Sequence, residues 1–99
     1  MRDYELTLVL RADLADSERE EIINQVVGWL PLEEGAEPAF NHWGRKRLAY
    51  PINKLDEGYY VLIEAKMETE GLDEVERNIS YVEDILRHLL IRKEEEAEA

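Results

Sequence analysis

The residues best suited to chemistry in this chain of 99 residues gather in one short basic segment. Between Asn41 and Lys54 there are four basic residues, one histidine and no acidic residue, whereas the whole chain has 24 acidic and 12 basic residues and a net charge of −12. A local reversal of charge on this scale favours contact with an anionic partner. The alternative is a solvated edge strand, because lysines on a sheet edge discourage unwanted pairing.

The spacing within this basic segment predicts an edge strand that carries cations on both sides. Alternation points Arg45 and Arg47 to one side and Lys46 to the other. Gly44 allows the backbone to bend or bulge, and Pro51 lacks the N–H that a central strand would need. Aromatic residues flank the cations, and this combination suits RNA, in which unstacked bases and phosphates lie close together.

Signals for an enzyme are missing from the sequence. It contains no cysteine, and its two histidines, His42 and His88, stand in no metal-ligand or triad pattern. It has no glycine-rich phosphate loop, and Ser17 fits a helix cap better than a nucleophile. Arg11 alone does not make the phosphate-binding loop of a small acylphosphatase. We therefore expect no catalytic residues, no metal and no cofactor.

Hydrophobic periodicity predicts six elements in the order strand, helix, strand, strand, helix, strand. A capping box that starts at Ser17 opens the first helix, and Pro31 ends it. This order is typical of the ferredoxin-like α+β fold, a four-stranded antiparallel sheet with both helices on one face. The predicted strands are 4–10, 37–50, 58–67 and 82–92, and the predicted helices are 17–30 and 69–80.

The length of the chain supports a single domain. We expect residues 1–93 to form the fold and residues 94–99 to form a flexible acidic tail, which either stays free or meets a basic partner. There is no apolar run of the roughly 18 residues that cross a membrane and no signal-peptide core at the start. We therefore expect a cytoplasmic protein without a membrane partner.

The segment Gly44–Asn53 resembles the signature of the bacterial small-subunit ribosomal protein six family. The family pattern is a glycine, any residue, a cation, a polar residue, leucine, a small residue, tyrosine, any residue, isoleucine and a polar residue, and this segment meets every term. The resemblance continues through segments 1–5, 53–62 and 85–87, so it covers nearly the whole chain. It implies the same ferredoxin-like fold and a structural, non-enzymatic role in translation.

The resemblance also implies partners. Family members bind the central domain of 16S rRNA in the platform of the small subunit, as a heterodimer with the basic ribosomal protein eighteen, and not DNA. A basic partner suits the charge of this chain, because phosphate repels a protein at −12 at long range. The residues that we expect to bind RNA are Arg2, Arg45, Lys46, Arg47, Tyr50, Lys54, Arg87, Arg92 and Lys93.

For the partner we expect a surface on the sheet face without helices. Tyr60 and Leu62 are predicted to lie there, since apolar residues left in water commonly mark an interface. The alternative for both is local packing. Trp43 either packs on the sheet or stacks on a base. Leu48 and Ile52 are predicted core positions, and the apolar body of the last strand is predicted to be Leu86, Leu89, Leu90 and Ile91.

Two other functions remain open from the residues alone. A different ferredoxin-like RNA-binding module would read single strands with paired aromatics on central strands, yet the first strand offers only Glu5, Thr7 and Val9 on the outward face. A small-molecule-sensing domain would need a defined pocket between helices and sheet. A small-molecule-sensing function would not explain why the segment from Asn41 to Lys54 is basic.

Overall fold

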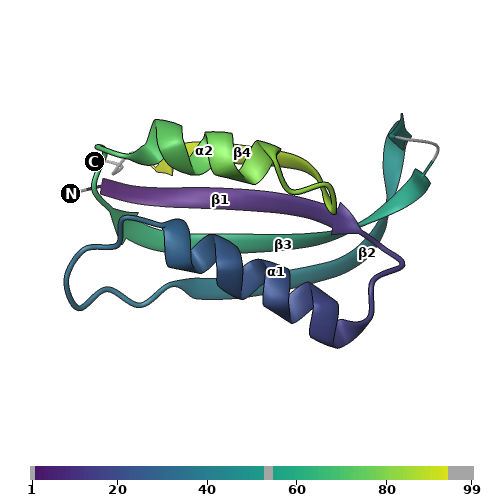
Figure 1. Ribbon diagram of the computed structural model, residues 1–99, viewed down its shortest axis with the longest axis horizontal. Coiled ribbons are helices and arrows are strands. Elements are labelled where there is room, and N and C mark those ends of the chain that lie inside the picture. The colour runs from purple at the N-terminus through teal and green to yellow at the C-terminus, as the bar shows by residue number, and fades with distance from the viewer. Residues whose placement is uncertain (1, 53–54, 94–99) are drawn as a thin grey trace, which may run out of the picture.

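The computed structural model describes residues 2–52 and 55–93 and contains six elements in the predicted order (Figure 1). The strands pair in the order β2-β3-β1-β4, and each pairing is antiparallel. The predicted ferredoxin-like fold is therefore confirmed. Lys54 and the predicted tail 94–99 lie outside the described residues. The elements are β1 (Arg2–Arg11), α1 (Asp16–Trp29), β2 (Ala39–Ile52), β3 (Leu55–Met67), α2 (Leu72–Ser80) and β4 (Ile85–Lys93).

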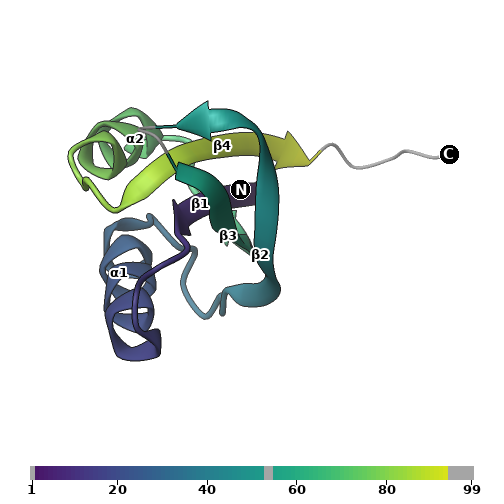
Figure 2. The same cartoon turned by 90° about the vertical axis from the view of Figure 1, so that its right-hand side faces the viewer.

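Both helices cover the same face of the sheet (Figure 2). Alternation in β1 turns Leu6, Leu8 and Leu10 toward the helices, where each is at most 1% exposed. Val26 of α1 and Ile79 of α2 are fully buried against them. Burial of such side chains is the main source of stability in a domain of this size. No helix of the described part of the chain is long and apolar enough to cross a membrane.

The ends of the helices depart in detail from the sequence prediction. Helix α1 begins at Asp16, with Ala15 as the residue before it, so the prediction that Ser17 caps this helix is wrong. The Glu18 carboxylate instead accepts a hydrogen bond of 3.0 Å from the Ala15 N–H. The helix ends at Trp29, as the proline at position 31 predicted. Helix α2 begins after Gly71, whose φ of 91° only glycine adopts readily.

The β2–β3 hairpin is longer than predicted, and its far end leaves the plane of the sheet. The two strands pair from Ala39↔Glu64 to Arg47↔Glu57, and pairing then breaks until Ile52↔Leu55. A bulge with Gly44 at a φ of +84° bends β2 before this end. The hairpin end, which we call the arm (residues 45–52 and 55–57), rises past the end of β1 toward the β4 side (Figures 1 and 2).

Gly58 marks the place where the arm meets the rest of the sheet. A Cβ atom at this position would lie 2.5 Å from Cγ1 of Val9 and 3.3 Å from Cδ2 of Leu48. Val9 is only 4% exposed, although it points to the sheet face without helices, which we call the open face. Leu48 of the arm therefore packs beside Val9, outside the main core in which it was predicted to lie.

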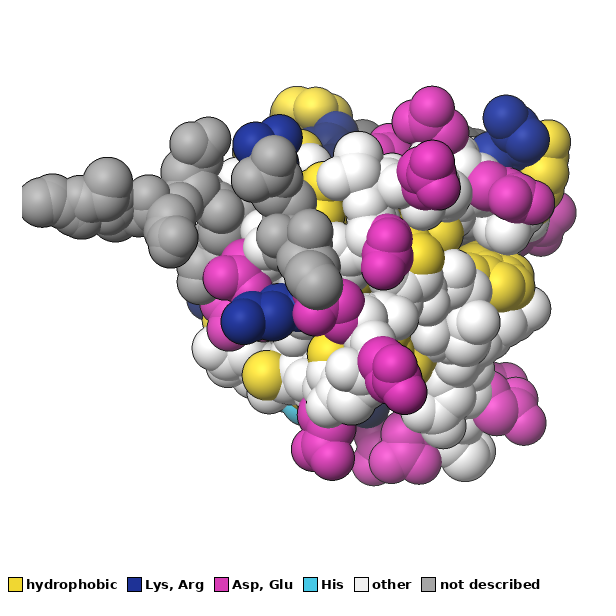
Figure 3. Space-filling view, turned by 90° about the vertical axis from the view of Figure 1, so that its left-hand side faces the viewer, with side chains coloured by type: hydrophobic (Ala, Val, Ile, Leu, Met, Phe, Trp, Pro, Cys, Tyr) yellow, Lys and Arg dark blue, Asp and Glu magenta, His cyan; other side chains and the backbone are white. Residues whose placement is uncertain are grey.

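Acidic side chains cover much of the molecule away from the arm. Figure 3 shows the end where β1 begins and β4 finishes, and Asp and Glu side chains are spread over its described surface. Lys and Arg side chains appear there only in a few separate places. Because the negative charges of these Asp and Glu side chains repel phosphate, RNA is not expected to bind at this end of the sheet.

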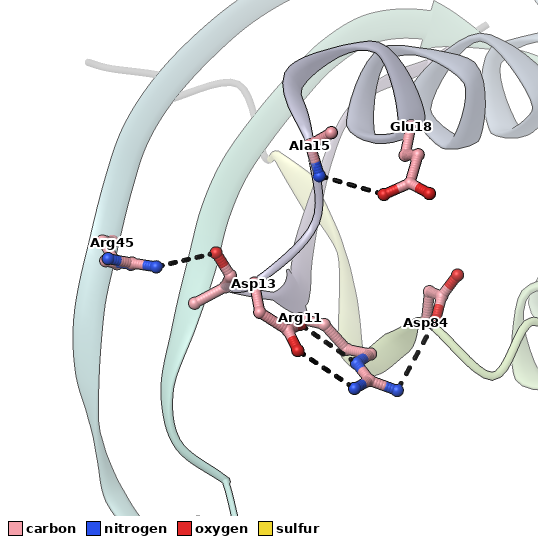
Figure 4. Close-up of polar contacts among 7 residues, drawn as sticks. Arg11, Asp13, Ala15, Glu18, Arg45 and Asp84 are labelled. Atoms are coloured by element: carbon pink, nitrogen blue, oxygen red, sulfur yellow. Dashed lines mark hydrogen bonds and ion pairs between the residues drawn. The ribbon is translucent and has the colours of Figure 1, made fainter.

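The loop after β1 is held by an exposed cluster of charged groups (Figure 4). The Arg11 guanidinium donates two hydrogen bonds of 3.2 Å to the Asp13 carboxylate and lies 3.9 Å from Asp84. These contacts lower the pKa of Asp13, chiefly through the hydrogen bond from Arg11, and raise the pKa of Arg11. Arg45 joins the loop from the arm, because its Nη2 donates to the Ala12 carbonyl at 3.0 Å.

Because Val9 lies close to Gly58, an alanine at position 58 is expected to destabilise the protein, whereas an alanine at position 28 is not. The Gly58→Ala substitution is expected to lower the free energy of unfolding by about 1–3 kcal/mol, because the new methyl group overlaps Val9. The matched control is Gly28→Ala in α1, where nothing lies within 4 Å of the new atom and a gain of about 0.4–1 kcal/mol is expected. Urea unfolding measures both, and equal effects would contradict the packing at Gly58.

The Asp13 carboxyl gives a second prediction. Because its pKa is lowered in the folded chain, its stabilising contribution is complete above the ordinary carboxyl pKa and disappears as pH falls through the lowered value. The Arg11→Gln substitution should return the pKa of Asp13 toward its ordinary value, and NMR titration of the carboxyl group measures this change. The control Arg45→Gln should leave most of the shift, since Arg45 contributes least. An unchanged pKa in Arg11→Gln would refute this assignment.

Candidate nucleic-acid interface

The structure divides the predicted RNA-binding residues into two groups. The strand register places Arg87 of β4 opposite Val9, beside the arm, and Arg92 opposite Tyr4, five residues further along. That separation is about 17 Å along an extended strand. The first group consists of Arg45, Lys46, Arg47, Tyr50 and Arg87, and the second of Arg2, Arg92 and Lys93.

Arg45 stabilises the base of the arm through contacts within the protein. Its Nε lies 3.4 Å from the Glu57 carboxylate across the hairpin, and its Nη2 donates to the Ala12 carbonyl (Figure 4). By contrast, Lys46 and Arg47 are exposed, and no carboxylate among the described residues lies within ion-pair distance of either. The two free cations next to Arg45 are therefore the groups of the arm that are available to a phosphate.

Tyr50 and Arg87 meet although they are 37 residues apart in the sequence. The Arg87 Nη2 donates a hydrogen bond of 2.6 Å to the Tyr50 hydroxyl oxygen, and the guanidinium carbon lies 5.2 Å from the centre of the tyrosine ring. The contact joins the arm to β4, at the other edge of the sheet from β2. Arg87 thus belongs to the same surface as the cations of the arm.

The second group lies at the end of the sheet that Figure 3 shows to be rich in acidic side chains. The backbones of Arg2 and Lys93 lie at the first residue of β1 and the last residue of β4, and Lys93 pairs with Asp3. Arg92 is exposed there. The structure does not bring these three residues to the arm, so one compact contact with RNA cannot include both groups.

The open face carries the residues predicted to bind a protein partner. Tyr60 is half-buried, and Trp43 stacks over it with ring centres 6.5 Å apart and ring planes 20° apart. Leu62 is 9% exposed, so its predicted exposure is wrong and local packing accounts for it, whereas its contact with a partner stays a prediction. Trp43 itself remains 47% exposed, because it covers Tyr60 with one side only.

Two apolar residues of the open face were missed as candidate contacts. Leu89 is 55% exposed and Ile91 is 44% exposed, although both were predicted to form part of the apolar body of the last strand. They alternate with Leu90, which faces the helices and packs against the core. The alternation signal was present in the sequence, but apolar residues on both sides of β4 hid which side was covered.

The hollows of the surface offer little to a small molecule. One open hollow of about 340 Å³ lies under the base of the arm and is lined by both signs of charge, from Arg45, Arg47, Asp13 and Glu57 among others. In the part of the chain that the structure describes, no group of three acidic or histidine side chains could hold a metal ion. The hollow under the arm does not lie between the helices and the sheet, where the small-molecule-sensing alternative requires a pocket.

Comparisons with known proteins identify the family. Residues 3–92 match the family model described as ribosomal protein S6. The small ribosomal subunit protein bS6 of Carboxydothermus hydrogenoformans is 35% identical over 94 residues, which cover 95% of this chain and 98% of that protein. The bS6 protein of Thermoanaerobacter pseudethanolicus is 38% identical and is covered over 100% of its length, against 96% of this chain.

A solved structure agrees on the fold. The crystal structure of the 30S ribosomal protein S6 from Thermotoga maritima superposes with a TM-score of 0.81 and covers 93% of this chain and 87% of that protein. The sequence identity of that pair is 24%, so this likeness shows the fold alone. The chain belongs to the ribosomal protein S6 family of the bacterial small subunit, whose members are cytoplasmic structural proteins of the ribosome and not enzymes.

Proposed function

We propose that this protein binds the central domain of 16S rRNA through its arm, as a heterodimer with the basic ribosomal protein eighteen. The observation that carries the proposal is the pair of exposed cations, Lys46 and Arg47, which stand free on the arm of a chain with a net charge of −12. Arg45 fixes the base of the arm through Glu57 and the Ala12 carbonyl. Membership of a small-subunit ribosomal family supports the choice of ribosomal RNA over other polyanions.

The size of this footprint explains why a partner is needed. Each cation that neutralises a phosphate contributes about 0.7–0.9 to the slope of log affinity against log salt concentration. Lys46 and Arg47 together therefore account for roughly a tenfold loss of affinity between 50 and 200 mM salt. Against a net charge of −12, two such contacts do not make a tight complex. A basic partner would add the missing positive charge.

The open face has the composition that a basic partner with an apolar patch requires. Leu89 and Ile91 are exposed on β4, and Tyr60 lies on the same face of β3. Glu5 and Glu64 are opposite one another on the two central strands of this face. Apolar contact with surrounding acidic groups favours a partner whose own apolar patch is ringed by lysine or arginine. Tyr60 stays in the proposed interface, and Leu62, which is buried, lies two residues further along the same face of β3.

The contact of the arm with RNA can be tested through its salt dependence. For the heterodimer on a 16S central-domain fragment, Arg47→Ala should lower the steepness of the salt slope by about 0.7–0.9, because one phosphate contact is lost. Lys46→Ala should lower it by a similar amount. The matched control is Arg77→Ala, an exposed arginine on α2, which removes the same charge from an element outside the arm. Equal effects of Arg47→Ala and Arg77→Ala would show that only net charge matters.

The partner surface predicts a second contrast. Leu89→Ser should weaken the complex with ribosomal protein eighteen by about tenfold, since a central apolar contact is worth more than about 1 kcal/mol. Tyr81→Ser is the control, because Tyr81 is 72% exposed and follows α2, away from the open face. Both variants should fold with nearly unchanged stability, as exposed positions tolerate substitution. Calorimetric titration measures the affinities, and a loss with Tyr81→Ser alone would place the partner elsewhere.

A further inference from the structure

We propose that Tyr50 and Arg87 are positioning residues, which form a clasp that holds the arm in its RNA-binding position and couples it to the partner surface on β4. The proposal rests on the RNA-binding function proposed above. It departs from what the family resemblance implies, in which both residues are contacts of RNA. In the structure these two side chains satisfy one another, with a hydrogen bond of 2.6 Å and the guanidinium over the ring.

The arm needs such a contact, because its own pairing is weak. Beyond Arg47↔Glu57 the two strands of the arm share one described ladder pair, Ile52↔Leu55. A two-stranded ribbon of this kind is marginally stable in water without tertiary support. The described residues give it support in three places. Arg45 donates to the Ala12 carbonyl at the base. Leu48 packs beside Val9 near the base, and Tyr50 binds Arg87 further out.

The clasp is exposed enough to open. Tyr50 is 57% exposed, and Arg87 is exposed as well, so water competes for the hydrogen bond between them. A charge-assisted hydrogen bond in such a place changes the ratio of held to released arm by about three- to tenfold, which is a bias and not a lock. Lys46 and Arg47 lie between Arg45, which fixes the base of the arm, and this clasp. Their position therefore depends on both ends.

The register of β4 links the clasp to the partner. Arg87, Leu89 and Ile91 follow one another at every second residue and pair with Val9, Thr7 and Glu5 of β1, so all three face the open side. Positions two apart on one strand face are about 7 Å apart.

A partner that packs on Leu89 therefore lies next to the clasp and excludes water from it. Exclusion of water strengthens the hydrogen bond, which raises the fraction of held arms and hence the affinity for RNA. By linkage, RNA on the arm must tighten the partner by the same factor.

The first test concerns the free protein and needs no RNA. Tyr50→Phe removes the hydroxyl that accepts the hydrogen bond and keeps the ring. Amide hydrogen exchange of residues 48–50, 52 and 55–57 should become about three- to tenfold faster, with exchange in the buried part of β1 unchanged. Tyr81→Phe is the matched control and should leave the arm unchanged. If Tyr50→Phe also leaves it unchanged, the clasp does not hold the arm and the proposal fails.

The second test is a double-mutant cycle on the heterodimer, with the 16S central-domain fragment as the probe. If the two residues act through each other, Tyr50→Phe with Arg87→Ala should lose no more affinity than Arg87→Ala alone, and Arg87→Ala should leave the salt slope unchanged. Each variant should also reduce the tightening that the partner gives to RNA binding. Additive losses, with a slope lowered by about 1 in Arg87→Ala, would make both residues direct contacts of RNA and overturn the proposal.

The two tests separate the clasp from the function on which it rests. A wild-type heterodimer that does not bind the fragment would refute the proposed function. Faster exchange of the arm in Tyr50→Phe would still establish the clasp in that case, and its role would then concern the partner alone. Unchanged exchange together with tight wild-type binding would refute the clasp and leave the proposed function intact.

Discussion

The approach of the arm to β1 at Gly58 is the constraint on which the functional surface depends. Without a side chain at this position, Val9 and Leu48 come together on a sheet face that has no helix to cover it. The end of the long hairpin bends over the sheet here, so that a residue of β2 reaches one of β4 across two intervening strands. A flat hairpin with the same cations would present them beyond the edge of the sheet, far from Arg87.

The protein shows how an acidic chain can belong to an RNA-rich assembly. Most of its charge is negative, and the end of the sheet opposite the arm carries acidic side chains that repel phosphate (Figure 3). The described cations of the arm differ in their surroundings, since Arg45 is paired with Glu57 while Lys46 and Arg47 are free. The positive surface of the arm is therefore small, and the net charge of the chain adds no attraction to phosphate.

The fold could be predicted from the sequence because its strands obey a simple alternation. Leu6, Leu8 and Leu10 repeat at every second residue, and the structure buries all three as that period requires. The path of the arm could not be predicted, because it depends on the contact of Tyr50 with Arg87, which no local pattern records. The burial of Leu62 was one of two alternatives that the sequence left open. Periodicity gives the side of the strand on which a residue lies, but not what covers that side.

The strand order also sets when this chain can fold. The central strand β1 is the first to be synthesised, yet its partners are β3, more than 40 residues further on, and β4, which pairs Lys93 with Asp3. Pairings over such separations close large loops, and their entropy slows folding relative to the local β2–β3 hairpin. On the ribosome, β1 therefore keeps one edge without a partner strand until β4 has left the exit tunnel. The acidic residues spread along the chain help to keep that intermediate from aggregating.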